Sequence, residues 1–546
     1  MNQLSYTQSP SLTPLLGETI CQNLKSTVEK FPTADALICL HQNYKVTYQE
    51  LWNEIERVSR ALLGIGLNKG DRLAVWSPNR FEWVLLQYAT ARIGVILVNI
   101  NPAYRSSELA YVINQSGSRY LFASLRFKTS DYKAMTNEVR NDCPGLERAY
   151  FFEDDWANFL KEADKVSVND LNERENSLHF DEPINIQYTS GTTGFPKGAK
   201  LSHHNILNNG FFIGERLHYT QRDRVCIPVP FYHCFGMVIG NLACTTHGSC
   251  MIIPSESFEP KKALEAVEKE RCTSLYGVPT MFIAELELEN FDSYDLKTLR
   301  TGVMAGSPCP VEVMKKVQSK MNMKEVSICY GMTETSPVSL QTVIGAPLEK
   351  QVGTVGTAQD HLELKIIDPE TGLVLPRGTS GELCTRGYSV MLGYWNNEKA
   401  TKEVLDEAGW MHTGDLAVMD DEGYVNIAGR IKDMILRGGE NVYPREIEEF
   451  LYTHPSVEDV QVIGVPSEKY GEEVMAWVKI KHGMSCTEEE LQVFCKNKIA
   501  HYKVPRFWKF VESFPITATG KIRKVEMREV SIRELGLEEV AKIKTS

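Results

Sequence analysis

Paired cysteines are missing from this sequence. Its 13 cysteines are scattered singly between Cys21 and Cys495, and no two of them are spaced as Cys-x-x-Cys. Disulfide frameworks usually show an even number of cysteines, and zinc sites usually show close pairs. We therefore predict reduced thiols, as in the cytoplasm, with neither a disulfide framework nor a zinc site.

An excess of positive charge is also missing. The 59 lysines and arginines are outnumbered by 71 aspartates and glutamates, which leaves a formal net charge of -12. Nucleic-acid binding needs a basic surface, so the composition predicts no nucleic-acid partner. With 546 residues, 42% of them hydrophobic, the chain can bury a large core and is too long for one domain by the usual relation of length to domain number.

Targeting and membrane signals are scarce. The start, Met1 to Tyr6, has no basic or long apolar run, and the first arginine is Arg57, so neither a secretory signal nor an arginine-rich transit segment is expected. The stretch Val225–Ser255 contains no Asp, Glu, Lys or Arg, but its prolines and polar side chains would be costly against lipid. We interpret it as a buried β-α-β piece and predict a cytoplasmic protein without a transmembrane segment.

Strand-like and helical segments alternate through the first part of the chain. Thr47-Tyr-Gln-Glu50 has the spacing of a helix capping box, and apolar residues then follow at helical intervals. Such alternation is typical of doubly wound parallel sheets with helices on both faces. Residues 127–180 are mixed and polar, and we interpret them as a connection. The strands expected are Arg72–Trp76, Val95–Val98, Tyr120–Ala123, Ile184–Tyr188, Val225–Val229, Cys250–Ile253, Ser274–Tyr276 and Val326–Tyr330, with helices over 81–93, 107–116, 237–244 and 260–270 and from Pro279.

Two further regions follow. From about 352 to 431, short alternating runs broken by turn residues predict hairpins in a β-rich subdomain. From 432 to 546 the pattern is that of a compact α+β piece, long enough to fold as a domain. We thus predict an α/β fold: a large N-terminal region, residues 1–431, of two doubly wound sheets plus the β-rich subdomain, and a small C-terminal α+β domain, residues 432–546.

The most informative stretch is Tyr188–Lys200, which reads Tyr-Thr-Ser-Gly-Thr-Thr-Gly-Phe-Pro-Lys-Gly-Ala-Lys. Its glycines allow backbone N–H groups to approach phosphate oxygens, its hydroxyls donate hydrogen bonds, and Lys197 supplies a positive charge. It is not a Walker loop, because Lys197 stands between Pro196 and Gly198 and no Ser or Thr follows it. The composition predicts a polyphosphate site in preference to a flexible surface loop.

Other motifs carry weaker signals. Tyr330-Gly-Met-Thr-Glu334 follows a predicted strand end, where open α/β sheets bind ligands. Tyr330 can stack on a purine, and Glu334 can hold a hard cation. Thr413-Gly-Asp415 offers a carboxylate that can accept from two neighbouring hydroxyls. Alone, each is an ordinary loop or turn, and a single histidine such as His233 is more often a core residue.

In this order, the motifs resemble those of the AMP-forming adenylating enzymes, which include acyl-CoA synthetases, firefly luciferase and the adenylation domains of peptide synthetases. The resemblance covers most of the chain and is greatest to medium-chain acyl-CoA synthetases of the acyl-CoA synthetase family member two type. It implies fatty acid, ATP and CoA as substrates, Mg²⁺ as the metal, and an acyl-adenylate intermediate. It implies small-molecule partners and leaves a homodimer open.

The resemblance also implies roles for nucleotide-site residues. Glu334 and Thr193 would hold magnesium, Asp415 and Arg430 would contact the ribose, and Lys521 would offset the charge between carboxylate and α-phosphate. The residues expected to bind ATP or AMP are Thr189, Ser190, Gly191, Thr192, Thr193, Gly194, Phe195, Pro196, Lys197, Gly198, Gly306, Ser307, Pro308, Tyr330, Gly331, Met332, Thr333, Asp415, Arg430 and Lys521.

The acid and the thiol would enter beside these residues. His233 would contact the acid and gate the thiol without acting as a base, and with Lys521 and Glu334 it would form the catalytic set. By position, and without any fixed charge for an amino acid's ammonium group, a pocket for a medium-length aliphatic acid is expected from His233, Met237, Val238, Met304, Ala305, Gly331, Pro337 and Val338.

The same resemblance implies a mobile small domain. Lys432 would be the hinge, and Gly438, Gly439 and Glu440 would enter the site for thioester formation, since glycines allow rotation and close approach. The domain would turn between the two half-reactions, so that one cleft serves both.

Two alternatives stay open. The first is an enzyme that stops at the adenylate or passes the acyl group to another acceptor, such as an acyl-AMP ligase or a peptide-synthetase module. The second is a non-catalytic adenylate-binding protein, which would usually have lost Lys197, Glu334 or Lys521, and all three are present. The apolar residues assigned to the acyl pocket could equally be ordinary core.

Overall fold

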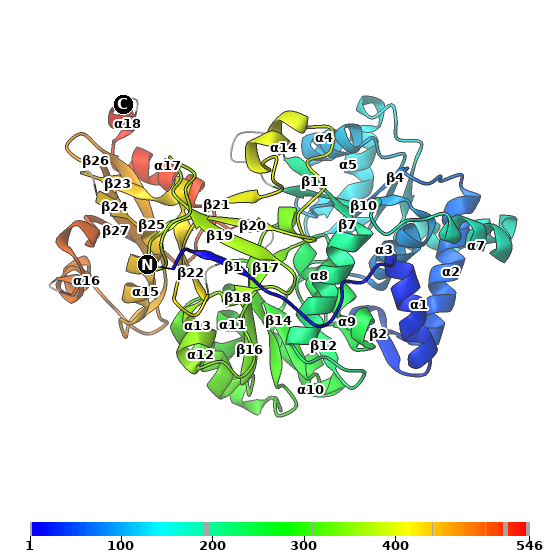
Figure 1. Ribbon diagram of the computed structural model, residues 1–546, viewed down its shortest axis with the longest axis horizontal. Helices are drawn as coiled ribbons and strands as arrows, with labels where there is room; N and C mark the ends of the chain where they lie inside the picture. Colours follow the sequence, from blue (N-terminus) through cyan, green and yellow to red (C-terminus); the bar gives the residue numbers. More distant parts are fainter. Residues whose placement is uncertain are drawn as a thin grey trace.

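A computed structural model describes residues 3–189, 196–307, 309–438, 440–496, 498–516 and 522–541 of the chain. Figure 1 shows three parts: two large sheets with their helices, a β-rich subdomain, and a small domain on the left that ends the chain. The α/β fold predicted from the alternation of strands and helices is confirmed. No helix among these residues is long and apolar enough to cross a membrane.

The first sheet is six-stranded, in the order β11-β10-β5-β4-β6-β9. All neighbours in it run parallel except β10 and β11, which form an antiparallel hairpin at one edge. Its strands are β4 (Arg72–Trp76), β5 (Ile96–Ile100), β6 (Tyr120–Ala123), β9 (Arg148–Phe151), β10 (Pro183–Thr189) and β11 (Lys197–Ser202).

The second sheet is nine-stranded, in the order β18-β17-β16-β15-β14-β12-β13-β2-β3. Its centre is parallel, and β3, β17 and β18 close the two edges in antiparallel pairing. Its strands are β2 (Asp35–Cys39), β3 (Tyr44–Thr47), β12 (Arg224–Cys226), β13 (Cys250–Ile253), β14 (Ser274–Gly277), β15 (Thr301–Ala305), β16 (Glu325–Gly331), β17 (Val338–Gln341) and β18 (Thr357–Ala358).

The helices between the two sheets form the main core. Val75 and Leu97 of the first sheet, Val303 of the second, and Leu86 and Leu207 from helices belong to one buried apolar cluster. Because this layer is covered on both sides, its helix α3 is buried over almost its whole length. The helices of this layer are α1 (Ile20–Lys30), α2 (Tyr48–Gly64), α3 (Phe81–Ile93), α8 (His203–Arg216), the π-helix η4 (Phe235–Leu242) and α9 (Ala243–His247).

Other helices surround the two sheets. The predicted capping box of α2 is present, with Glu50 and Thr47 bonded to each other's backbone. Helices on or near the first sheet are α4 (Ser106–Ser116), α5 (Tyr132–Glu138), α6 (Phe152–Phe159) and α7 (Val168–Asn176), and those on the second are α10 (Pro260–Glu270), α11 (Pro279–Leu286), α12 (Val311–Lys320) and α13 (Leu348–Gly353).

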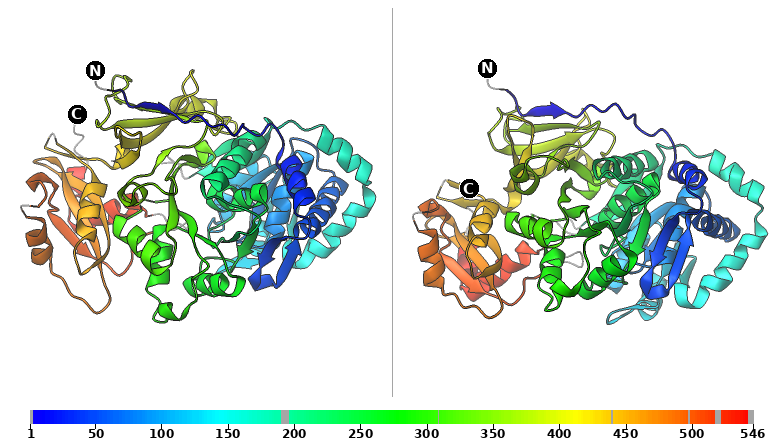
Figure 2. Two further views of the ribbon diagram at one scale, coloured as in Figure 1. Left: turned by 60° about the horizontal axis from the view of Figure 1, so that its bottom comes forward. Right: turned by 90° about the horizontal axis from the view of Figure 1, so that it is seen from below.

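The β-rich subdomain has an unexpected first strand. Its sheet runs β1-β19-β20-β21-β22, so the N-terminal β1 (Tyr6–Gln8) pairs with β19 far along the sequence. Figure 2 shows the dark blue N-terminal segment lying across the yellow-green subdomain before it reaches α1. The remaining elements are β19 (Glu363–Ile367), β20 (Gly381–Arg386), α14 (Glu398–Val404), β21 (Met411–Met419) and β22 (Val425–Arg430).

The small domain begins after a short 3-10 turn, η7 (Ile431–Asp433). On α15, Glu449 accepts a hydrogen bond of 3.5 Å from the backbone N–H of Val311, so this helix lies against the start of α12. The elements of the small domain are β23 (Ile435–Arg437), β24 (Glu440–Val442), α15 (Pro444–Tyr452), β25 (Val457–Ser467), β26 (Gly471–Ile480), α16 (Glu488–Cys495), β27 (Phe507–Phe510), α17 (Lys524–Glu534) and α18 (Glu538–Ala541).

One detail of the prediction is wrong, and one predicted helix has an unexpected form. The stretch 127–180 is more than a connection, because it contains the edge strand β9 and helices α5 to α7. These elements were not recognised because an edge strand and surface helices bury only one side, so the sequence of this stretch is mostly polar. The helix predicted over 237–244 is present, but its first part is the π-helix η4, whose wider turn cannot be recognised from the sequence periodicity.

One buried carboxyl group stands apart in this fold. Glu285 on α11 is 1% exposed, and neither of its carboxylate oxygens has a hydrogen-bond partner in the part of the chain that is described. Burial raises the pKa of Glu285 well above its usual value. The folded protein therefore favours the neutral form of Glu285 more strongly than the unfolded chain does, and this difference lowers stability at a pH where the unfolded chain ionises the group.

We expect Glu285→Met to raise the free energy of unfolding by about 1–3 kcal/mol near pH 7. Because the folded-state pKa is raised, the stability that Glu285 contributes is present below its unfolded pKa and is lost as pH rises toward its folded pKa. The advantage of the variant should therefore grow in urea titrations as the pH rises above about 5, where the unfolded chain ionises the group. Glu289→Met, at an exposed position, is the control; an advantage that does not change with pH would mean that ionisation is not the cause.

Candidate active site

The hairpin of β10 and β11 carries the predicted phosphate site. Thr189 at the end of β10 lies opposite Lys197 at the start of β11. Residues Ser190–Phe195, which join them, lie outside the described residues. Gly198 has no room for a side chain, because a Cβ there would be 2.8 Å from Ile186 Cγ2. The hairpin therefore sets a hydroxyl and an ammonium group at the two ends of the glycine-rich loop.

A segment that sequence reasoning missed runs beside this hairpin. The Trp395 N–H donates to the Gly198 carbonyl at 2.7 Å, and the Lys200 N–H donates to the Gly393 carbonyl at 3.0 Å. These bonds bring Tyr394 to the site, with the Lys197 Nζ atom 5.2 Å from the centroid of its ring. Gly393-Tyr-Trp395 is visible in the sequence as a glycine followed by two aromatics, but its pairing with β11 is not.

Glu334 lies at the centre of the site. It belongs to the 3-10 turn η6 (Thr333–Thr335), which follows β16, and it is only 4% exposed. Its Oε1 atom accepts from the Tyr394 hydroxyl at 2.7 Å and from the Thr189 hydroxyl at 3.3 Å. Burial, and then the Glu334 carboxylate, raise the pKa of Tyr394, so its hydroxyl keeps the proton that it donates.

The donor set at Glu334 fits a hard divalent cation. Both of these hydrogen bonds go to Oε1, which orients the carboxylate and leaves Oε2 for another partner. Carboxylate and hydroxyl oxygens are the protein ligands that Mg²⁺ prefers, usually beside phosphate oxygens and water. The second predicted ligand, Thr193, lies outside the described residues.

Asp415 lies at the other end of the site. It is 9% exposed on β21 and pairs in register with Arg430 on β22. Its Oδ1 atom is 3.2 Å from Arg430 Nε, and its Oδ2 atom accepts from the Tyr330 hydroxyl at 2.5 Å. Burial and the nearby Asp415 carboxylate raise the pKa of Tyr330 well above its ordinary value. The structure thus brings together three residues that the sequence assigned to a nucleotide site.

The short segment from Tyr330 to Glu334 joins the two ends. Tyr330 contacts Asp415, and Glu334 contacts Thr189. These five residues therefore connect the carboxylate that is expected to bind the ribose with the hairpin that is expected to bind the phosphates. Gly331 must be glycine, because a Cβ there would lie 1.7 Å from the Pro337 carbonyl oxygen. Met332 and Thr333, also predicted here, form the bend between the two contacts.

His233 lies in the turn that precedes the π-helix η4. Its Nδ1 atom accepts from the Phe235 N–H at 3.2 Å, so in the neutral ring the proton is on Nε2. The side chain is half-buried. π-helices are rare in proteins, and those that occur are often found at functional sites. The π-helix η4 therefore fits a turn that contacts substrate.

Most of the predicted acyl-pocket residues share one face. Met237 and Val238 on η4, Ala305 on β15 and Val338 on β17 belong to the same buried cluster between the two sheets. The Met237 sulfur accepts from the amide of Gln187 at 2.8 Å, which places it beside β10. Gly331 and Pro337 lie next to them at the ends of β16 and β17.

Met304 does not share that face. It is fully buried in the cluster formed with helices such as α10 and α12 on the outer side of the second sheet. Successive residues of a strand point to opposite faces, so Met304 and Ala305 cannot line one pocket. The prediction that Met304 lines the acyl pocket is wrong for this reason, and the remaining residues stay candidates.

Several predicted positions surround this core of the site. Gly306 and Ser307 follow the end of β15, and Gly306 has a left-handed backbone, with φ +90°. Lys432 lies exposed in η7, and Gly438, with φ +61°, begins the turn between β23 and β24, where Glu440 is exposed. Pro308, Gly439 and Lys521 lie outside the described residues.

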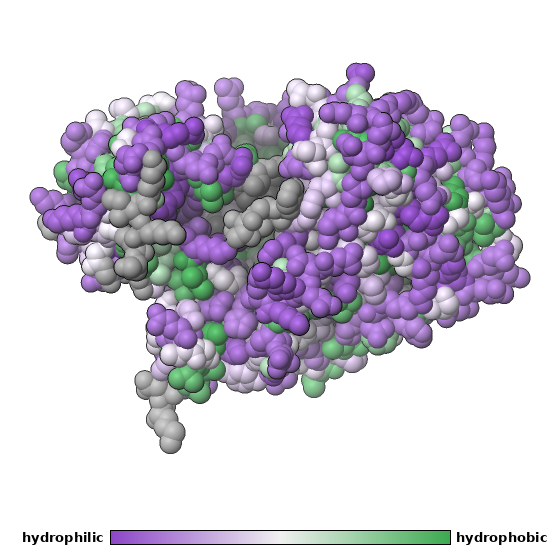
Figure 3. Space-filling model, turned by 90° about the horizontal axis from the view of Figure 1, so that it is seen from above, coloured by the Kyte–Doolittle hydropathy of each residue, from purple (hydrophilic) through white to green (hydrophobic). Residues whose placement is uncertain are grey.

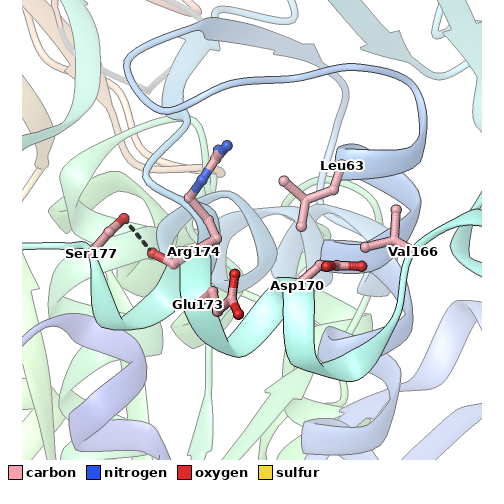
Figure 4. Close-up of a pocket in the computed structure, with 6 residues that line it drawn as sticks. All are labelled: Leu63, Val166, Asp170, Glu173, Arg174 and Ser177. Carbon is pink, nitrogen blue, oxygen red and sulfur yellow. Dashed lines mark hydrogen bonds between the residues drawn. The ribbon is translucent and has the colours of Figure 1, made fainter.

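The surface of the molecule is hollowed between the small domain and the larger region, as Figure 3 shows. A different depression, of about 450 Å³, lies between α2 and α7 and is shown in Figure 4. None of the predicted site residues lines it. Its lining residues are Leu63, Val166, Asp170, Glu173, Arg174 and Ser177.

Comparison with known proteins agrees with this geometry. Residues 24–395 match the AMP-binding enzyme family, and residues 446–521 match the AMP-binding enzyme C-terminal domain. The chain is 47% identical over 543 residues to the putative acyl-CoA synthetase YngI of Bacillus subtilis, covering 96% of this chain and 99% of that protein. It is 43% identical over 557 residues to the medium-chain acyl-CoA ligase ACSF2, mitochondrial, of Danio rerio, covering 98% of this chain and 91% of that protein.

The fold is shared with solved structures. The crystal structure of the anthranilate CoA ligase AuaEII in complex with anthranoyl-AMP superimposes with a TM-score of 0.85 at 25% identity, covering 96% of this chain and 99% of that chain. Family, relatives and fold all point the same way. This chain belongs to the AMP-binding enzyme family, and within it to the acyl-CoA synthetases.

Proposed function

We propose that this protein joins a medium-chain fatty acid to CoA at the expense of ATP, through an acyl-adenylate. The observation that carries this proposal is the segment Tyr330–Glu334. It contacts Asp415 at one end and Thr189 of the phosphate hairpin at the other. A nucleoside polyphosphate is the ligand class that needs three features in one line: a carboxylate that accepts hydrogen bonds from the ribose hydroxyls, an aromatic face for the base, and a loop that binds phosphates.

ATP would lie along this line. The ribose hydroxyls would donate to Asp415, whose Oδ2 atom now accepts from Tyr330, so the nucleotide would share or displace that bond. The adenine would lie between Tyr330 and the Gly306-Ser307 segment. The β- and γ-phosphates would lie at the glycine-rich loop, where Lys197 supplies positive charge.

In the first step, a carboxylate oxygen of the fatty acid bonds to the α-phosphorus of ATP. The bond from that phosphorus to the bridging oxygen breaks, and diphosphate leaves with the electron pair. Glu334, held by Tyr394 and Thr189, would hold Mg²⁺, which supplies charge neutralisation for the phosphate oxygens when bound. Lys521 would stabilise the charge that gathers between carboxylate and α-phosphate.

In the second step, the CoA sulfur bonds to the acyl carbon and gives its proton to water or to the departing phosphate, and AMP leaves with the electron pair of the broken C–O bond. For this step the small domain would turn about Lys432, withdraw Lys521 and bring Gly438, Gly439 and Glu440 inward. Closing the site would exclude water from the reactive anhydride. His233, half-buried at the start of η4, would border the acyl group and the path of the thiol.

The acyl chain would extend between the two sheets. Met237, Val238, Ala305 and Val338 line this side and carry no charge. An apolar pocket without a charged partner favours an aliphatic acid over an amino acid. The medium chain length rests on the likeness to the ACSF2 ligases named above.

The compartment and assembly are also proposed. The 13 cysteines remain thiols and all except Cys486 are buried, which suits a reducing compartment such as the cytoplasm. The Danio rerio relative is named mitochondrial, so fractionation of the source cells decides between the two compartments. Light scattering of the purified chain distinguishes a monomer from a homodimer.

The proposal is tested by assaying the purified chain with ATP, Mg²⁺, CoA and straight-chain acids from acetate to palmitate. Acyl-CoA and AMP should appear together, with a maximum at medium chain length. AMP release or ATP–pyrophosphate exchange without any thioester would favour an acyl-AMP ligase or another acceptor. No AMP with any of the acids would favour a non-catalytic adenylate-binding protein.

Asp415→Asn should weaken ATP binding. The amide is a weaker acceptor than the carboxylate and loses the attraction to Arg430, so KM for ATP should rise about tenfold to a hundredfold. Initial rates of ATP–pyrophosphate exchange measure this change. Asp421→Asn, on an exposed turn of the same subdomain, should leave KM unchanged. Equal KM values for the Asp415 variant and the wild type would place the ribose elsewhere.

A further inference from the structure

A cluster outside the proposed nucleotide site contains three side chains of metal-ligand type. Glu382 and Cys384 are on β20, and His412 is on the neighbouring strand β21. One ligand atom from each lies within 4.8 Å of the others. Among the described residues, no other group of three or more such side chains meets this criterion.

The distances within the cluster suit a tetrahedral ion. His412 Nδ1 is 3.0 Å from Glu382 Oε2 and 3.6 Å from Cys384 Sγ. An ion with bonds of about 2.0–2.3 Å holds its ligand atoms about 3.3–3.6 Å apart in tetrahedral geometry. A small movement of the Glu382 carboxylate would therefore let one ion contact all three atoms.

The surroundings match those of metal-bound histidines. The second ring nitrogen, His412 Nε2, faces Asp406 Oδ2 at 3.8 Å, and such a carboxylate commonly orients a ligating imidazole. Cys384 is fully buried, whereas one edge of the cluster is open at His412. Lys365 on β19 lies opposite Cys384. The charged side chains around the site are therefore this lysine and the carboxylates of Glu382 and Asp406.

The cluster lies at the base of the turn that presents Asp415. The register of β20 and β21 shifts between Glu382 and Cys384, so the extra residues of β21 bulge outward. In this bulge the Gly414 N–H donates to Glu382 Oε1 at 3.1 Å, and Gly414 has φ +70°. An ion held here would tie the bulge to β20.

We propose that Glu382, Cys384 and His412 bind a zinc-type divalent cation that fixes the bulge carrying Asp415. Mixed sulfur, nitrogen and oxygen ligands select zinc-like ions over Mg²⁺ or Ca²⁺. A fourth position is left for water. Binding releases the thiol proton of Cys384, so the affinity rises with pH. The cysteine spacing pointed to no zinc site because this cluster uses one cysteine and draws its other ligands from two strands.

The test uses the full chain, stripped of metal and titrated with Co²⁺ as the spectroscopic probe. One Co²⁺ per chain should give a thiolate-to-metal charge-transfer absorption together with the visible bands of a tetrahedral ion. Cys384→Ser and His412→Gln should each lose these bands, and Zn²⁺ should displace Co²⁺ from the wild type. Circular dichroism of both variants shows whether they remain folded.

A matched control is available in the same chain. Cys39 Sγ is also buried beside a histidine, 3.4 Å from His41 Nδ1, but it belongs to no such trio. Cys39→Ser should therefore keep the cobalt bands. Zn²⁺ should raise the Tm of the wild type and of Cys39→Ser, but not that of Cys384→Ser.

Two outcomes would overturn the proposal. A charge-transfer band that survives in Cys384→Ser would place the sulfur ligand elsewhere. Co²⁺ that binds with oxygen-type spectra only would assign the ion to carboxylates such as Glu334, and would identify the cluster as a Glu382–His412 ion pair beside an ordinary core thiol. Neither outcome bears on ligase activity, which the acyl-CoA assay tests separately.

Discussion

Glu334→Gln is expected to lower the rate of ATP–pyrophosphate exchange by about a hundredfold or more. Glutamine keeps the shape of the side chain and can still accept from Tyr394 and Thr189, whose bonds of 2.7 Å and 3.3 Å hold the present carboxylate. It loses the negative charge that a divalent cation needs. The loss should be greatest at low Mg²⁺, so exchange is measured across a Mg²⁺ series.

Two further variants make this result specific. Tyr394→Phe removes only the hydroxyl that orients Glu334, so its loss should be nearer tenfold and should shift the Mg²⁺ dependence in the same direction. Glu325→Gln changes a carboxylate that is paired with Arg300 at the other end of β16, and it should have no effect on exchange. If Glu334→Gln exchanged pyrophosphate at the wild-type rate, the carboxylate would not serve the first step.

Lys521→Ala is expected to abolish adenylation, with a loss of about a hundredfold or more, while thioester formation from pre-made acyl-adenylate largely persists. The reason is electrostatic. A positive charge between carboxylate and α-phosphate offsets charge that exists only while the P–O bond is being made. Attack of the CoA sulfur on the finished adenylate has no such requirement. The two half-reactions are assayed separately, by pyrophosphate exchange and by CoA consumption.

Gly439→Leu should show the opposite division. The proposed rotation of the small domain brings Gly439 beside the acyl-adenylate only for the second step, where a leucine side chain would occupy the space that the CoA thiol needs. Leucine at 439 should therefore harm the thioester step more than exchange. Parallel losses in both assays, for either variant, would contradict a division of labour between two positions of the small domain.

Local features of the fold could be predicted well. The strands Arg72–Trp76 and Tyr120–Ala123 and the helices α3 and α10 were expected with the bounds that the structure has. The capping box predicted at Thr47 is present. Each of these depends on residues within one or two turns of the chain, so periodicity and capping chemistry are sufficient.

Pairing between distant segments could not be predicted. β1 joins β19, and β2 and β3 add to a sheet whose other strands begin after residue 223, because any exposed strand edge can accept a partner of suitable register. The same limit applies to the site. The contact of Tyr394 with Glu334 depends on the pairing of 393–395 with β11, which leaves no periodic trace.

The sequence by itself determined which chemical groups this protein can offer: a loop rich in glycine and hydroxyl residues with one lysine, the carboxylates of Glu334 and Asp415, and a late lysine. The tertiary structure decided which of these meet. It placed Met304 on the face of β15 that points away from the expected acyl pocket. It also brought Tyr394 to Glu334 and placed Glu382, Cys384 and His412 together. The physical reason is that residue type sets what a side chain can bind, whereas strand order, register and face set which side chains come within bonding distance.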